Sequence, residues 1–142
     1  MKADDPQIGP EEVLYRYSPS IPHEHWTVTD QGTKKVSISV AAVRFDDDGI
    51  SCYRHRILAE HGLSWADVKR EPKNGVFSML VKDVREVRLG VAFDPYPETE
   101  QPHPRDVAHS LVVDNDLPKK QGRKAREDLA KRAQIIHSGS TE

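Results

Sequence analysis

Short apolar segments recur along this chain of 142 residues, and each is bounded by proline, glycine or clustered acidic residues. Segments of this length that are rich in β-branched and aromatic residues are typical of strands. Residues 35–45 are the clearest case, because Val36, Ile38, Val40 and Ala42 alternate with smaller or polar residues. Residues 50–53 fit a strand or the entry to a helix. We predict strands at 13–17, 35–45, 76–81, 91–93 and 108–113, with a short extended piece at 27–28.

Helical patterns lie between these segments. Good helix formers occupy 54–61 and end at Gly62, and Ser64 with Asp67 resembles a capping box that opens a short helix. Residues 114–116 predict the N-cap of a longer helix that runs to about His137, with Pro118 in its first turn. Residues 82–90 fit a short helix or a charged strand, and 46–49 a turn.

These elements predict a single α+β domain, with an antiparallel or mixed sheet of about four to six strands and two or three packed helices. We place the domain at 13–137, with flexible segments at 1–12 and 138–142. The net charge of −2 gives no global field for nucleic acid, and the single Cys52 excludes a disulfide framework. The acidic first residues contain no signal-peptide pattern, and no apolar run matches a membrane span. We therefore expect a cytoplasmic protein.

The helix after residue 118 concentrates cations in its first half. The helix dipole disfavours positive charge at that end, so an anionic partner would compensate for it. The alternative is a solvated helix face, which is the usual role of a charge run. The candidate contact residues for a protein partner, a phosphate or nucleic acid are Lys119, Lys120, Arg123, Lys124 and Arg126.

Seven histidines form the second candidate set. His23 and His25 would point the same way on a strand, and His103 and His109 flank a segment that enters a strand. Such imidazoles could hold zinc or iron with Glu24, Asp94 or Asp106. Their spacing matches no metal motif, so we predict no metal and no cofactor. The alternative for His109 is a half-buried side chain bonded to the backbone.

Arg16, Arg44, Tyr53 and Glu60 form the third set. Arginines on neighbouring strands could lie side by side, with the glutamate on a following helix near them. The segments "LYRY" and "RILAE" look similar to the layout of RES-type ADP-ribosyl-transferring toxins, which implies a dinucleotide held by these residues. The segment between them, "FDDDGISCYRHR", departs from that layout, and cross-strand charge balance is the alternative interpretation.

The segments "NGVFSMLVKDVREVRLGVAFDPYP", "AHSLVV" and "RKAREDLAKRAQII" resemble a set of short uncharacterised bacterial proteins. The resemblance implies a bacterial context and no particular activity, and "VVDNDLPKKQG" departs from it. Nucleophile-elbow, P-loop and dinucleotide motifs are absent from the sequence. We therefore expect a non-enzymatic accessory protein that binds a protein partner through charged surfaces and proline-rich loops. Phosphate or nucleic-acid binding and an ADP-ribosyltransferase-like or histidine-metal enzyme are the alternatives.

Overall fold

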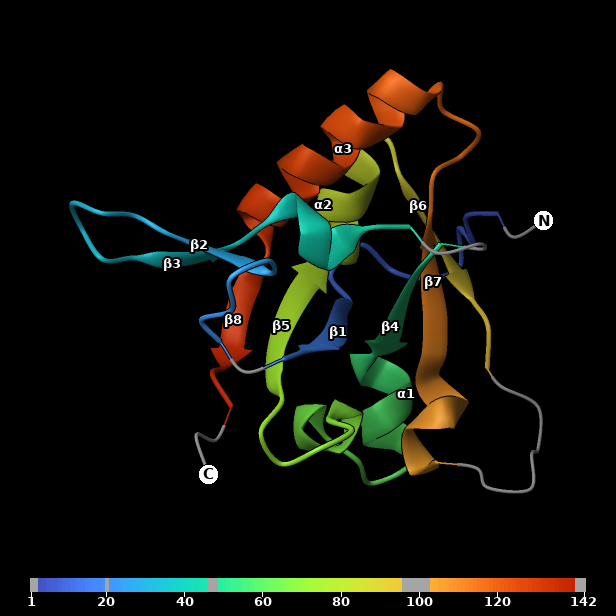
Figure 1. The fold of residues 1–142 in the computed structure, drawn as a ribbon. Coiled ribbons are helices and arrows are strands. Elements are labelled where there is room, and N and C mark those ends of the chain that lie inside the picture. Colours follow the sequence, from blue (N-terminus) through green and yellow to red (C-terminus); the bar gives the residue numbers. More distant parts are fainter. Residues whose placement is uncertain (1–2, 20, 46–48, 96–102, 140–142) are drawn as a thin grey trace.

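Six strands form one antiparallel sheet in the order β6-β7-β4-β1-β5-β8, and two more pair in a separate ribbon, β2-β3 (Figure 1). The computed structural model describes residues 3–19, 21–45, 49–95 and 103–139. The sheet strands are β1 Val13–Ser18, β4 Ile50–Arg54, β5 Gly75–Leu80, β6 Gly90–Phe93, β7 His109–Val113 and β8 Gln134–His137, and the ribbon strands are β2 Thr27–Thr29 and β3 Val36–Ile38. The helices are α1 His55–Glu60, α2 Val81–Glu86 and α3 Lys119–Arg132, with 3₁₀ turns at η1 Val40–Val43, η2 Trp65–Val68 and η3 Pro104–Ala108. The predicted α+β class is confirmed.

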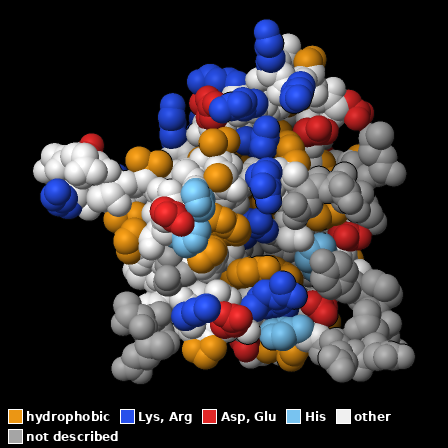
Figure 2. Space-filling view, viewed as in Figure 1, with side chains coloured by type: hydrophobic (Ala, Val, Ile, Leu, Met, Phe, Trp, Pro, Cys, Tyr) orange, Lys and Arg blue, Asp and Glu red, His pale blue; other side chains and the backbone are white. Residues whose placement is uncertain are grey.

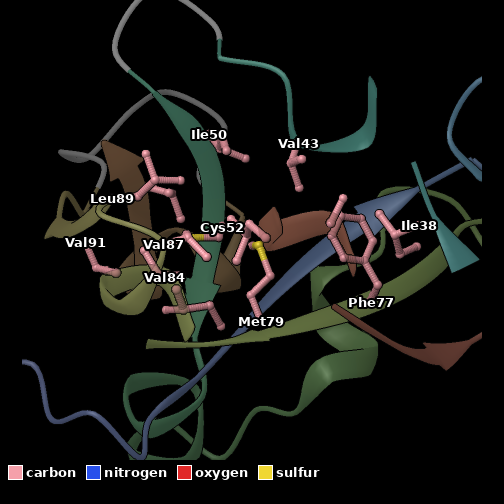
Figure 3. Close-up of a cluster of buried hydrophobic side chains, with 14 of the residues drawn as sticks. Ile38, Val43, Ile50, Cys52, Phe77, Met79, Val84, Val87, Leu89 and Val91 are labelled. Carbon is pink, nitrogen blue, oxygen red and sulfur yellow. The ribbon is translucent and has the colours of Figure 1, made fainter. Parts of the chain in front are cut away.

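Successive residues of each strand point to opposite faces of the sheet. One face carries Leu14, Cys52, Phe77 and Met79, which pack in one apolar cluster with α2 and α3. Figure 3 shows several of these side chains converging from β4, β5 and α2. The other face carries a second cluster that includes Tyr15, Tyr53, Leu58 of α1, Val68 of η2 and Ala108 of η3.

The strand predicted at 35–45 is wrong in its second half. β3 ends at Ile38, and η1 follows at Val40–Val43. The 3₁₀ turn lets the adjacent residues Ala42 and Val43 both enter the core beside Leu129 of α3. Strict alternation would have turned one of these two apolar side chains to the opposite face. The predicted turn at 46–49 falls largely outside the described residues.

The predicted helix boundaries at 114–137 are also wrong. α3 begins after Pro118, which is its N-cap, and it ends at Arg132. Asn115 and Asp116 have positive φ angles of 54° and 59° and form a turn before the helix. Residues 134–137 form β8, which pairs with β5 and so provides hydrogen-bond partners for a strand that would otherwise be an exposed edge.

The folded domain extends to the N-terminal side of residue 13. Ile8, in the segment that we expected to be flexible, is 1% exposed in the core. The Asp4 carboxylate accepts a hydrogen bond from the Val91 amide at 2.8 Å, and Glu12 pairs with Arg54. These contacts attach the segment to the sheet.

Candidate functional site

The face of the sheet beneath η2 and η3 places an arginine between two tyrosines. The Arg105 guanidinium carbon lies 5.6 Å from the Tyr17 ring centroid and 5.2 Å from that of Tyr53. Its Nη1 donates to the carbonyl of Val68 at 2.6 Å. Arg105 is only 6% exposed, and its buried Nε has no hydrogen-bond partner among the described residues. A buried donor without a partner costs free energy, so this arginine lowers the stability of the fold at this position.

A reciprocal cap sets the backbone that carries Arg105. The His103 Nδ1 accepts from the Arg105 amide at 3.2 Å, and the Asp106 carboxylate accepts from the His103 amide at 2.9 Å. Partial burial and the charge of Arg105 lower the pKa of His103. The neutral imidazole accepts the capping bond through its Nδ1.

Two more arginines, Arg16 and Arg70, line one cavity with Tyr17, although Arg16 projects from the sheet face that carries Leu14 and Phe77. Arg16 of β1 donates from Nε to the Ala42 carbonyl at 2.9 Å and from Nη1 to the Ser51 carbonyl at 2.8 Å, and it lies over the Trp26 ring. Arg70 follows η2 and donates to the Tyr17 hydroxyl at 3.3 Å. These contacts hold both guanidinium groups beside aromatic rings.

Two depressions lie next to each other here. A cavity of about 490 Å³ contains Arg16, Arg44, Trp26 and Lys73 in its wall, and one of about 330 Å³ contains Ser51, Tyr53, His103, Arg105 and Asp106. Tyr17 and Arg70 line both cavities, so the two adjoin. We call the combined depression the arginine groove. Lysine and arginine side chains run down the middle of the visible face in Figure 2, from α3 toward the opposite end of the molecule.

Ser51, which lines the smaller cavity, makes a chain of contacts with His109 and Asp94 behind it. The His109 Nε2 lies 3.0 Å from the Ser51 Oγ, and its Nδ1 lies 2.8 Å from the Asp94 carbonyl and 3.5 Å from an Asp94 carboxylate oxygen. The ring of Tyr53 contacts the imidazole edge-on, with centroids 5.6 Å apart. Burial lowers the pKa of His109, although the Asp94 carbonyl and carboxylate favour protonation.

Some cationic side chains of α3 form ion pairs within the helix, and others are exposed to solvent. Arg123 pairs with Glu127 at 3.2 Å, and Lys124 pairs with Asp128 at 3.1 Å. Arg126 lies over the Phe45 ring at 5.2 Å, and together with Arg123 and Arg44 it lines a cavity of about 180 Å³. Lys119 and Lys120 are exposed in a first turn that has no acidic residue.

The four candidate histidines do not come together in one site. His23 caps its own loop, since its Nδ1 accepts from the amides of His25 and Trp26, and the His23 and His25 rings are 5.8 Å apart. His103 caps η3, and His109 is 1% exposed. Within the described ranges, histidine, cysteine, aspartate and glutamate side chains form no group of three or more that could hold a metal ion.

The structure brings together three members of the set Arg16, Arg44, Tyr53 and Glu60. The first three line the arginine groove, although Arg16 and Arg44 are in one cavity and Tyr53 in the other. Glu60 instead pairs with Arg56 on α1 at 3.4 Å, with half of its side chain exposed. Glu60 is not among the residues that line the groove.

Our sequence reasoning missed Arg70, Arg105 and the pairing of Ser51 with His109. Ser110, the neighbour of His109 in the sequence, points to the opposite face of the sheet, and its hydroxyl donates to the Ala108 carbonyl at 3.2 Å. The register Tyr53↔His109 between β4 and β7 puts Ser51 on the same face as the imidazole. Predicting the contact of Ser51 with His109 requires the order of the strands in the sheet, which the periodicity of the sequence does not supply. Cys52 packs as a small apolar residue in the core, and burial raises its pKa to about 12.

Comparisons with protein-family models, with curated proteins and with solved structures found no match. Over the described residues, each helix is too short or too polar to cross a membrane.

Proposed function

We propose that the protein binds a nucleotide, a ligand with both phosphate and an aromatic base, in the arginine groove. The observation that carries this proposal is the composition of the groove wall. Arginines and a lysine outnumber carboxylates there, and aromatic rings lie among them. The cationic lining residues are Arg16, Arg44, Arg70, Lys73 and Arg105, and the acidic ones are Glu71 and Asp106.

Guanidinium groups favour phosphate because their planar N–H donors match two phosphate oxygens at once. Arg105 lines the groove beside two tyrosine rings, and the bond from its Nη1 to the Val68 carbonyl fixes the position of its guanidinium group. Arg44 is exposed at the junction with the cavity beside α3. A phosphate chain could therefore extend from the groove toward Arg123 and Arg126.

The aromatic side chains of the groove would bind the base of the nucleotide. Trp26 lies half-buried in the wall of the larger cavity beside Arg16, and Tyr17 lies between the two cavities. Base stacking on such rings contributes about 1–3 kcal/mol per base. The larger cavity, of about 490 Å³, lies within the usual size range of small-molecule sites.

Tryptophan fluorescence tests the proposal directly. The chain has two tryptophans, so Trp65→Phe leaves Trp26 as the only indole reporter. Titration of this variant with ATP should quench Trp26 fluorescence with saturation. Arg44→Glu should weaken binding at least tenfold, because it replaces a charge-assisted contact with repulsion. Lys82→Glu makes the same charge change on an exposed residue of α2 and should leave the affinity unchanged. Absence of saturable quenching at millimolar ATP would contradict the proposal.

A second proposal concerns α3. We infer that an acidic surface of a protein partner docks at its N-terminal end, because Lys119 and Lys120 are exposed and unaccompanied by acids in the first turn. Arg123 and Lys124 already have intrahelical partners, so they contribute less to such an interface. Reversal of Lys119 and Lys120 to glutamate should abolish capture of a stoichiometric partner from the native cell. Capture that survives the reversal counts against this end of α3 as the contact.

A further inference from the structure

The hydrogen bonds of His109 determine which of its nitrogens carries the proton. The Nδ1 lies 2.8 Å from the Asp94 carbonyl oxygen, which can only accept, so Nδ1 carries the hydrogen and donates it. A neutral imidazole then has an unprotonated Nε2. That Nε2 lies 3.0 Å from the Ser51 Oγ, so the serine hydroxyl donates its proton to it. With this direction of the hydrogen bond, the His109 Nε2 can accept the serine proton, as a general base does for a nucleophile.

His109 and Ser51 differ in their exposure to solvent. His109 is 1% exposed, which keeps water away from the base, whereas Ser51 is partly exposed and lines the smaller cavity of the groove. The ring of Tyr53 lies edge-on to the imidazole and limits its rotation. The Asp94 carboxylate oxygen at 3.5 Å from Nδ1 would stabilise an imidazolium when one forms.

Charged groups around the hydroxyl come from several elements. Arg105 of η3 and Arg70 after η2 line the same cavity as Ser51, and Asp106 and His103 line it as well. The arginines could stabilise negative charge that develops on a reacting phosphate. Asp106 already accepts the His103 amide bond within the cap, which orients its carboxylate toward the backbone.

We propose that Ser51 is a nucleophile that cleaves phosphodiesters of nucleotides bound in the arginine groove, with His109 as its general base and Asp94 as the residue that positions His109. The choice of substrate rests on the proposed nucleotide binding, whereas the nucleophile rests on the Ser51–His109–Asp94 geometry.

The Ser51 Oγ attacks phosphorus, its proton passes to the His109 Nε2, and the bond from phosphorus to the leaving alcohol breaks with return of that proton to the alcohol oxygen. Water then attacks the phosphoserine, His109 accepts a proton from the water, and the Oγ–P bond breaks as Ser51 regains the proton. The net reaction consumes one water and yields a phosphomonoester and an alcohol. Burial lowers the pKa of His109, which keeps the base unprotonated at neutral pH.

An alkyl fluorophosphonate tests the nucleophile without any nucleotide. Its P–F bond should break and a bond from phosphorus to the Ser51 Oγ should form, with release of fluoride. Peptide mass spectrometry should locate the adduct on Ser51. His109→Gln should slow labelling by about 10²-fold or more, since it removes the base. Ser51→Ala should abolish labelling. Ser110→Ala, on the same strand as His109 but bonded to the Ala108 carbonyl, is the matched control and should be labelled as fast as wild type.

Turnover of thymidine 5′-monophosphate 4-nitrophenyl ester tests the substrate class. The wild type should release 4-nitrophenolate at a rate that falls as pH drops and His109 becomes protonated, and Ser51→Ala should release none. A purely structural Ser51–His109 bond would give neither labelling nor turnover in folded wild-type protein, and that result overturns the inference. ATP binding without labelling overturns the nucleophile alone, whereas labelling without ATP binding overturns the proposed nucleotide site and leaves Ser51 supported.

Discussion

On one face of the six-stranded sheet, Leu14, Cys52 and Phe77 pack in an apolar cluster with α2 and α3. On the opposite face, Tyr53 and His109 lie beneath η3 among hydrogen-bonding groups and arginines. Adjacent residues of a single strand, such as Cys52 and Tyr53 of β4, therefore serve opposite purposes. α2 and α3 cover the apolar face, and α1 covers the other face together with η2 and η3. Substitutions on the two faces should therefore have different effects on stability.

The apolar face should show the largest loss of stability. Phe77 is 0% exposed and belongs to the apolar cluster of this face. Phe77→Ala should lower the free energy of unfolding by about 3–5 kcal/mol, because it removes buried area and leaves a cavity. Urea denaturation measures this loss. Tyr17→Phe on the opposite face, which removes only a partly exposed hydroxyl, should cost less than about 1 kcal/mol, and equal losses from the two substitutions would contradict the comparison.

A buried ion pair is an exception to the apolar character of the first face. Arg54 Nε lies 2.9 Å from a Glu12 carboxylate oxygen, and their side chains are 9% and 7% exposed. Glu12→Gln should lower the free energy of unfolding by about 3 kcal/mol, because it leaves the Arg54 charge buried without its counter-ion.

The matched control for this pair is Glu127→Gln. This substitution breaks the pair of Arg123 and Glu127, whose side chains are 70% and 40% exposed, respectively. It should lower the free energy of unfolding by less than about 1 kcal/mol. If Glu12→Gln costs no more than Glu127→Gln in the same urea titration, the buried pair does not stabilise the N-terminal segment as we infer.

On the polar face, we expect the free energy of unfolding to depend on pH. Burial lowers the pKa of His109 below its ordinary value of 6.5. The unfolded chain therefore takes up a proton at higher pH than the folded one, and protonation favours unfolding. The free energy of unfolding should fall as pH drops through 6.5 and should stop falling from this cause below the folded pKa. Urea denaturation from about pH 8 to about pH 5 should show a smaller slope in His109→Gln, and an equal slope would exclude His109 as the source.

The strands that form the sheet could largely be predicted from the sequence, whereas the contacts on its polar face could not. Short runs rich in β-branched and aromatic residues located β1, β5, β6 and β7 and indicated the α+β class. They could not locate β8, because residues 134–137 continue the apolar spacing of the helix and become a strand only when β5 is there to pair with them. The contact of Ser51 with His109 likewise depends on the β4–β7 register, which joins residues far apart in the chain. Neither partner has a local motif that would have indicated the pairing.

The smallest predicted effect concerns the exposed surface of α3. Lys119 begins the helix, where the dipole disfavours a cation, and no acidic residue lies in that first turn. Lys119→Glu should therefore raise the free energy of unfolding by about 0.5 kcal/mol. Lys131→Glu makes the same charge change in the last turn and should lower it by a similar amount. Thermal unfolding at low salt measures both, and high salt should reduce both effects through screening. Opposite signs at the two ends would mean that Lys119 is kept at a cost to stability, as an anionic partner would require. Equal signs would mean that net charge, and not the position on the helix, governs the stability of α3.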